Sequence, residues 1–137
     1  MQSLLTPVLA LIVWSLIVWL WMYATRIPAM QKAGIDSQAA QHTAALSVLP
    51  PRVRGVADNY NHLMEQPTIF YAMVFYIVLC GHSDQIHIYL AWSYVALRIV
   101  HSFIQNTVNI VAVRFAVFTL STLALAAMAA REVIALL

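Results

Sequence analysis

Residues 58–72 have the sequence DNYNHLMEQPTIFYA, which places a glutamate, Glu65, at the start of a long apolar stretch. An arginine, Arg98, interrupts a second apolar stretch further along the chain. An ionisable side chain at the centre of a bilayer costs about 2.5–3.5 kcal/mol on insertion scales, so such residues usually face the inside of a helix bundle and mark a functional site. The two side chains have opposite charge. They therefore predict one polar site between two membrane helices.

The composition of the chain is typical of a membrane protein. Of its 137 residues, 63% are hydrophobic and 9% are charged, against about 25% charged residues in ordinary soluble domains. The length fits one domain. The net charge of +2, without a run of basic residues, argues against a nucleic-acid partner. The single cysteine, Cys80, excludes an intramolecular disulfide and a cysteine-ligated metal cluster.

Four hydrophobic segments are predicted to cross the membrane as helices, in one domain that covers residues 1–137. A helix needs about 20 residues to span the 30 Å hydrocarbon core of a bilayer. From the uncharged runs and the polar residues between them, we expect helices at about 4–23, 56–81, 86–105 and 109–135. The predicted fold class is all-α, an integral membrane four-helix bundle.

The loops between the predicted helices indicate an orientation. The first loop, residues 24–55, holds four basic residues and one acid, whereas the second, residues 82–85, holds no lysine or arginine. Basic loops tend to stay in the cytoplasm, so we expect the first loop there and both termini outside. His82 and His87 lie near the opposite surface and are interpreted as solvated loop or interface residues.

This orientation brings the two charged residues to a similar depth. At 1.5 Å per residue, Glu65 lies about nine residues, roughly 13 Å, from the cytoplasmic end of its helix, and Arg98 lies about eight residues from the same surface. We expect the two to contact each other directly or through a neighbour such as His62. Helical spacing places more polar side chains on the same two faces: Asp58 and His62 with Glu65, and His101 and Gln105 with Arg98.

Other interpretations of these residues remain open. Glu65 and Arg98 can form an ion pair that only joins two helices, and Arg114, about one turn into the fourth helix, can extend to the lipid headgroups. His62 and His101 are more typical of hydrogen-bonding residues than of metal ligands, because no HxxxH or carboxylate–histidine ligand set accompanies them on one helix. We expect no metal site.

Two motifs resemble those of a known family. The first is DNYNHLMEQPTIFYA at 58–72, with a polar residue, a glutamate and then a proline early in the helix; the second is ALRIVHS at 96–102, followed by VRF at 113–115. With four hydrophobic segments and a long basic first loop, they are similar to the MAPEG family, membrane-associated proteins of eicosanoid and glutathione metabolism. The resemblance covers essentially the whole chain and is closest to the bacterial branch, which implies a bacterial inner membrane.

The resemblance implies a homotrimer with active sites between subunits that face the cytoplasm. Glutathione would bind there, and hydrophobic small molecules or lipids would arrive through the membrane. Arg114 matches the arginine beside the glutathione sulfur, where a guanidinium favours the thiolate, and is the expected catalytic residue. The expected glutathione-binding residues, which match or occupy the family's site positions, are Arg26, His62, Glu65, Arg98, His101 and Gln105.

Three positions differ from the family pattern. Asp58 stands where well-studied members have an arginine, His62 stands where they have an asparagine, and Gln105 lies near the position of a tyrosine. These changes remove positive charge and hydrogen-bond donors from the site expected to hold the glutathione carboxylates.

Several functions fit the sequence. The leading prediction is a glutathione-dependent transferase or peroxidase that acts on lipophilic electrophiles at the membrane. The alternatives are an enzyme of the same fold that uses another thiol or a small anion, a non-catalytic trimeric membrane scaffold or lipid-binding protein, and a small proton-coupled exporter. Exporters of that kind are expected to carry a glutamate in the first helix, and the first predicted helix here has no charge.

Overall fold

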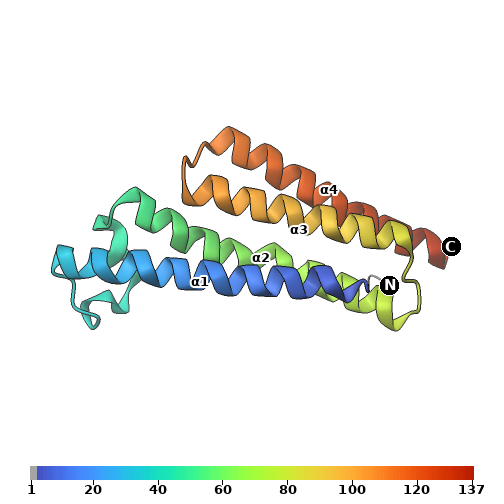
Figure 1. Ribbon diagram of the computed structural model, residues 1–137, viewed down its shortest axis with the longest axis horizontal. Coiled ribbons are helices and arrows are strands. Elements are labelled where there is room, and N and C mark those ends of the chain that lie inside the picture. Colours follow the sequence, from blue (N-terminus) through green and yellow to red (C-terminus); the bar gives the residue numbers. More distant parts are fainter. Residues whose placement is uncertain (1–2) are drawn as a thin grey trace.

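The computed structural model describes residues 3–137 and is all-helical over that range. The long α-helices are α1 (Leu5–Ala33), α2 (Pro51–Leu79), α3 (Gln85–Asn106) and α4 (Val111–Leu136), and two short 3₁₀ helices, η1 (Ala39–Gln41) and η2 (Thr43–Val48), lie between α1 and α2. The start of α1, the α2–α3 connection and the end of α4 lie toward one end of the molecule (Figure 1). The α1–α2 and α3–α4 connections lie toward the other end, and the α1–α2 hairpin extends beyond α3 and α4 there.

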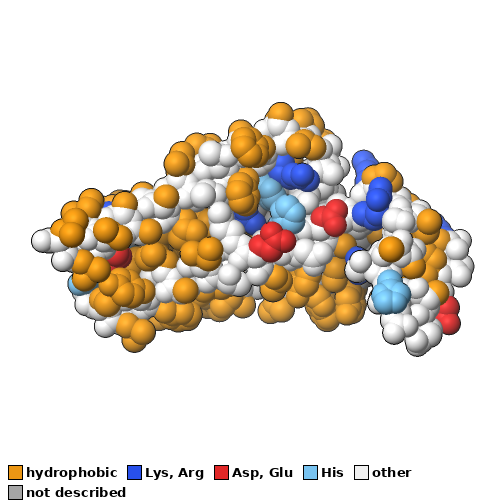
Figure 2. Space-filling view, turned by 180° about the vertical axis from the view of Figure 1, so that it is seen from behind, with side chains coloured by type: hydrophobic (Ala, Val, Ile, Leu, Met, Phe, Trp, Pro, Cys, Tyr) orange, Lys and Arg blue, Asp and Glu red, His pale blue; other side chains and the backbone are white. Residues whose placement is uncertain are grey.

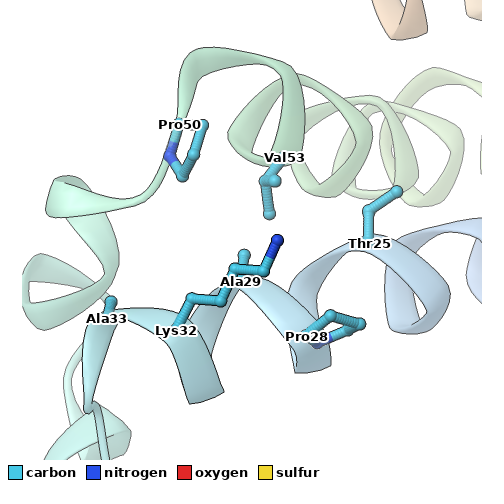
Figure 3. A pocket seen from close by; sticks show the side chains of 7 residues that line it. All are labelled: Thr25, Pro28, Ala29, Lys32, Ala33, Pro50 and Val53. Carbon is cyan, nitrogen blue, oxygen red and sulfur yellow. The ribbon is translucent and has the colours of Figure 1, made fainter.

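This extension arises because α1 and α2 are longer than their apolar segments. Helix α1 continues past Tyr23 to Ala33, and the chain then turns at Gly34, whose φ of 68° is a left-handed conformation that glycine adopts at little cost. Helix α2 begins at Pro51 rather than near Val56, with proline at a helix start where its missing N–H is not needed. The extended ends enclose a cavity across which Lys32 of α1 reaches toward Val53 of α2 (Figure 3).

The helices differ in how apolar they are. By length and composition, α1 and α4 are apolar enough to cross a membrane. Helices α2 and α3 do not reach the same apolarity, because they carry most of the polar side chains that the sequence places within predicted membrane segments. These are also the helices whose polar faces form the candidate site.

The core lies where the two helix pairs, α1 with α2 and α3 with α4, come together. Phe70 of α2 and Tyr94 of α3 are fully buried and stack with ring centroids 4.4 Å apart. Gly55 permits another close approach, because a Cβ atom at this position would lie 3.1 Å from the backbone oxygen of Gln105. This contact brings the first turns of α2 against the end of α3. Large apolar side chains on the outer face of α4, such as Phe115 and Leu123, are exposed.

Candidate functional site

Charged and histidine side chains gather near the middle of one face, and others lie toward the α1–α2 end of the same face (Figure 2). A cavity of about 220 Å³ lies between α2, α3 and α4, and we call it the polar cavity. The residues that line it are His62, Glu65, His101, Val111, Arg114, Phe115 and Phe118. The cavity brings together four of the site residues expected from the sequence, from three different helices. Its apolar wall comes largely from α4.

Arg98 lies behind this cavity rather than on its surface. Its side chain is 1% exposed, and its Nη2 donates a hydrogen bond to the backbone oxygen of His62 at 3.3 Å. The guanidinium carbon also lies 5.2 Å from the ring centroid of Phe118. A buried charge is costly unless it is paired and hydrogen-bonded, yet Nε and Nη1 have no hydrogen-bond partner within the described chain. Two hydrogen-bond donors of Arg98 thus remain without a partner behind the cavity in the described part of the chain.

Glu65 and Arg98 do not form a direct ion pair among residues 3–137. The Glu65 side chain is exposed, and the ion pairs in this range are made by other residues. Arg98 instead contacts His62, which lies one helical turn before Glu65. Arg98 thus meets α2 at the backbone of His62, and a direct contact between the two charged side chains is not seen in the described residues.

Two histidines form the inner wall of the cavity. The rings of His62 and His101 are stacked, with centroids 6.1 Å apart and an interplanar angle of 25°. His101 is buried and also lies against Phe118, at 6.0 Å between ring centroids. His62 is half-buried and lines the opening. His101 therefore supports the ring of His62 from behind.

Arg114 is held in place by the turn that precedes α4. Its Nη1 donates a hydrogen bond to Oδ1 of Asn109 at 2.6 Å. Asn109 has a positive φ of 49°, which asparagine tolerates better than most residues. The sequence alone does not indicate this bond to Arg114. Phe115 and Phe118 were not predicted as site residues either, since an aromatic residue on an apolar helix carries no distinctive signal.

Besides Arg98, two expected site residues lie outside the polar cavity. Arg26 lines a second cavity of about 330 Å³ between α1, η2 and α2, together with Arg54, Asp58 and Asn61. Gln105 is buried at the end of α3, where its backbone packs on Gly55. Within one chain, neither residue joins the side chains around Arg114.

A second polar group, the α4-end network, lies at the opposite end of the helices. It consists of His82, Asp84, His87, Arg131 and Glu132. His82 Nδ1 donates to Glu132 Oε2 at 2.7 Å, and His87 Nε2 lies 3.4 Å from Oε1 of the same carboxylate. The Nε of Arg131 donates to His87 Nε2 at 3.3 Å, and Arg131 is also paired with Asp84.

This network corrects the interpretation of His87 as a solvated residue. His87 is 2% exposed, and its neighbour Glu132 is 5% exposed, although the side chain of His82 is accessible. The sequence did not predict the contact between His87 and Glu132, because Glu132 lies far along the chain, in the last turns of α4. Asp84 caps α3 by accepting a 2.8 Å hydrogen bond from the His87 N–H. That bond, with the charges of His87 and Arg131, lowers the pKa of Asp84 below its usual value.

Comparison with known proteins agrees with the motifs around the polar cavity. The model of the MAPEG family matches residues 4–134, nearly the whole chain. Searches of curated proteins and of solved structures find no significant match. The family match includes α2, α3 and α4, which supply every residue that lines the polar cavity. The chain therefore belongs to the MAPEG family, whose members are integral membrane proteins that generally use glutathione.

Proposed function

We propose that this protein is a glutathione-dependent transferase or peroxidase that acts on lipophilic electrophiles at the membrane. The observation that carries the proposal is the composition of the polar cavity. Arg114 lines this cavity together with the imidazoles of His62 and His101 and the rings of Phe115 and Phe118. This arrangement offers positive charge for a sulfur anion and an apolar surface for an electrophile that enters from lipid.

The residues present fit a thiol that carries carboxylates and an amine. Arginine binds carboxylates through its planar fork of donors. Arg114 brings such a fork to the cavity wall, and the buried Arg98 adds positive charge from behind it. Glu65, exposed in the cavity wall, can accept hydrogen bonds from an ammonium group. Arg26 and Arg54, on the neighbouring face, offer further positive charge, although Asp58 lies in the same cavity.

In the proposed reaction, Arg114 stabilises the sulfur anion. A thiol has an ordinary pKa near 8.5, so it is mostly protonated at neutral pH, and an adjacent guanidinium favours the ionised form. Such fixed charge, aimed at an anion in a site that excludes water, is among the strongest contributions a protein makes to a rate. The thiol supplies the nucleophile, and Phe115 and Phe118 hold the lipophilic electrophile next to it.

We also propose that the active unit is a homotrimer of four-helix bundles. The polar cavity of one chain measures about 220 Å³, below the roughly 300–1,000 Å³ of typical small-molecule sites. A neighbouring subunit packed on the exposed side chains of α4 would enlarge and close it. With the first loop in the cytoplasm of a bacterium and the termini outside, the cavity would face the cytoplasmic side of the inner membrane.

A non-catalytic trimeric scaffold or lipid-binding protein is the second candidate. Asp58 shares a cavity with Arg26 and Arg54, and its charge opposes the binding of a carboxylate there. The large apolar residues exposed on α4 fit a lipid or a neighbouring subunit equally well.

The test compares wild type with Arg114→Ala for conjugation of glutathione to a hydrophobic aryl halide in detergent. We expect kcat/KM to fall by about 10²–10³, the usual effect of removing one electrostatic stabiliser of an anion. Lys32→Ala is the control, because Lys32 is a basic residue in a different cavity (Figure 3). Unchanged turnover in a folded Arg114 variant would disprove its role. Absence of turnover in every protein would favour the scaffold.

A further inference from the structure

Thiolate formation in the polar cavity needs a proton acceptor as well as a positive charge. The guanidinium of Arg114 is always protonated and has no acceptor atom, so it can stabilise a sulfur anion but cannot take the proton. The cavity wall contains three side chains that can accept one: His62, Glu65 and His101. The three differ in how accessible they are to a ligand and in how readily they accept a proton.

His101 is poorly placed to accept a proton from a ligand. It is 2% exposed and is covered by the stacked ring of His62 on one side and by Phe118 on another. A positive imidazole at this position would be buried one turn from the fixed charge of Arg98, and both burial and a like charge disfavour the charged form. His101 therefore serves as the support of His62.

The remaining choice is between a carboxylate and an imidazole. A thiol has an ordinary pKa of about 8.5, a glutamic acid about 4.3 and a histidine about 6.5. Transfer of a proton from a thiol to a typical carboxylate is therefore unfavourable by a factor of about 10⁴, and transfer to a typical imidazole by about 10². General bases work best when their pKa lies near the operating pH, and by ordinary values an imidazole meets this condition better than a carboxylate does.

The contacts of His62 leave its ring at the cavity. The residue's hydrogen bond to Arg98 is made by the backbone oxygen, not by the side chain. Its ring is oriented by stacking on His101 and lines the same cavity as Arg114. His62 is thus an oriented, partly exposed imidazole that lines the same cavity as the guanidinium.

We infer that His62 is the general base of the thiol reaction, a role that rests on the proposed function. Its imidazole accepts the proton of the S–H group, and the electron pair of that bond stays on the sulfur beside Arg114. With an aryl halide, the sulfur attacks the carbon that carries the halogen. The S–C bond forms, the C–halogen bond breaks and the halide leaves with its electron pair. His62 then releases its proton to water.

The experiment measures turnover of glutathione with a hydrophobic aryl halide between about pH 6 and pH 9. Wild type is compared with His62→Gln, which keeps a polar side chain of similar length, and with His42→Gln. His42 lies in the exposed α1–α2 connection and is the matched control for loss of a histidine. At neutral pH we expect His62→Gln to turn over about 10²-fold more slowly, the usual effect of losing a general base, and His42→Gln to match wild type.

The pH profile separates a base from a structural residue. Near pH 9 most of the thiol is ionised without help, so the defect of His62→Gln should shrink there, and added imidazole should restore part of the rate at neutral pH. Thermal stabilisation by glutathione, measured for each variant, verifies folding and binding. His62→Asn provides a second variant with a smaller polar group.

Three results would overturn the inference. If wild type and both His62 variants share one pH profile, His62 is not the base, although the proposed function stands. If the defect persists at all pH values and imidazole does not reduce it, the role of His62 is structural. If wild type shows no glutathione-dependent turnover, the proposed function fails and the role of His62 fails with it.

Discussion

Two groups of polar side chains lie at opposite ends of the helices, and burial gives them different properties. The polar cavity leaves Glu65 exposed, whereas the α4-end network buries the carboxylate of Glu132. A buried carboxylate is tolerated only with hydrogen-bond partners. His82 supplies such a hydrogen bond, and His87 lies 3.4 Å from the same carboxylate, so the last turns of α4 are tied to the α2–α3 connection and the start of α3.

Replacement of Glu132 by alanine tests this tie. We expect Glu132→Ala to destabilise the fold by about 1.5–3 kcal/mol, the range for hydrogen bonds to a charged group, because His87 is left buried without its carboxylate. The measurement is denaturant or thermal unfolding in detergent. Asp36→Ala, which removes an exposed acid from the α1–α2 connection, should have little effect. Equal stability of the two variants would contradict the prediction.

Single residues show which parts of the site could be predicted from the sequence. Helical spacing grouped His62 with Glu65, and the family motif added His101 and Arg114; all four line one cavity. Spacing failed for Gln105, which lies on the expected face but is buried against α2. Helical spacing predicts on which face of a helix a residue lies, but it does not predict which other helix packs against that face. The pairing of Glu132 with His82, 50 residues apart, was unpredictable for the same reason.

The ends of the helices are set by capping and turn residues, not by the ends of the apolar segments. Helix α1 has 29 residues and, at 1.5 Å per residue, a length of about 43 Å, well beyond the roughly 30 Å of bilayer hydrocarbon. Hydropathy predicted the part from Leu4 to Tyr23, because it reports contact with lipid rather than helical conformation. Gly34 and Pro51 determine the actual limits.

The start of α3 gives a prediction with a pH dependence. Asp84→Ala removes both the N-cap bond and the pair with Arg131, and loss of an N-cap costs about 0.5–2 kcal/mol. Asparagine caps a helix about as well as aspartate does, so Asp84→Asn should lose less stability than Asp84→Ala. The lowered pKa of Asp84 means that the folded state favours the carboxylate.

The sign of this dependence follows from the direction of the shift. The contribution of Asp84 is present above its usual pKa of 3.8 and is lost as pH falls through the lower pKa of the folded state. Below about pH 4, the free energy of unfolding measured with denaturant should therefore fall more for wild type than for Asp84→Asn. Parallel curves for the two proteins over that range would show that Asp84 contributes nothing through its charge.

The molecule as a whole presents both a wide apolar surface and an open polar cavity. Residues such as Phe115 and Leu123 of α4 are exposed, and in a membrane lipid or another subunit must cover them. A polar cavity that opens among such residues is sheltered from lipid only if a neighbour covers it. The proposed homotrimer would meet both needs at once.

Native mass spectrometry in a mild detergent tests the assembly. We expect the mass of three chains, because burial of the cavity rim and of the outer face of α4 favours association. A sample in denaturing detergent should give single chains and so show that the assembly is not covalent. Monomers in every mild detergent tried would exclude the trimer.

The unequal apolarity of the helices also has a consequence for synthesis of the chain at the membrane. Helix α1 emerges first and is apolar enough to enter lipid unaided, whereas α2 and α3 carry polar groups and follow it. Polar side chains of these two helices bond each other: Ser102 donates to Asn59, and Tyr94 donates to Gln66. The two middle helices are therefore best inserted as a hairpin with its polar faces already joined, before α4 leaves the ribosome. Biogenesis of this protein would then depend on a step in which the insertion machinery holds two helices together rather than releasing them one by one.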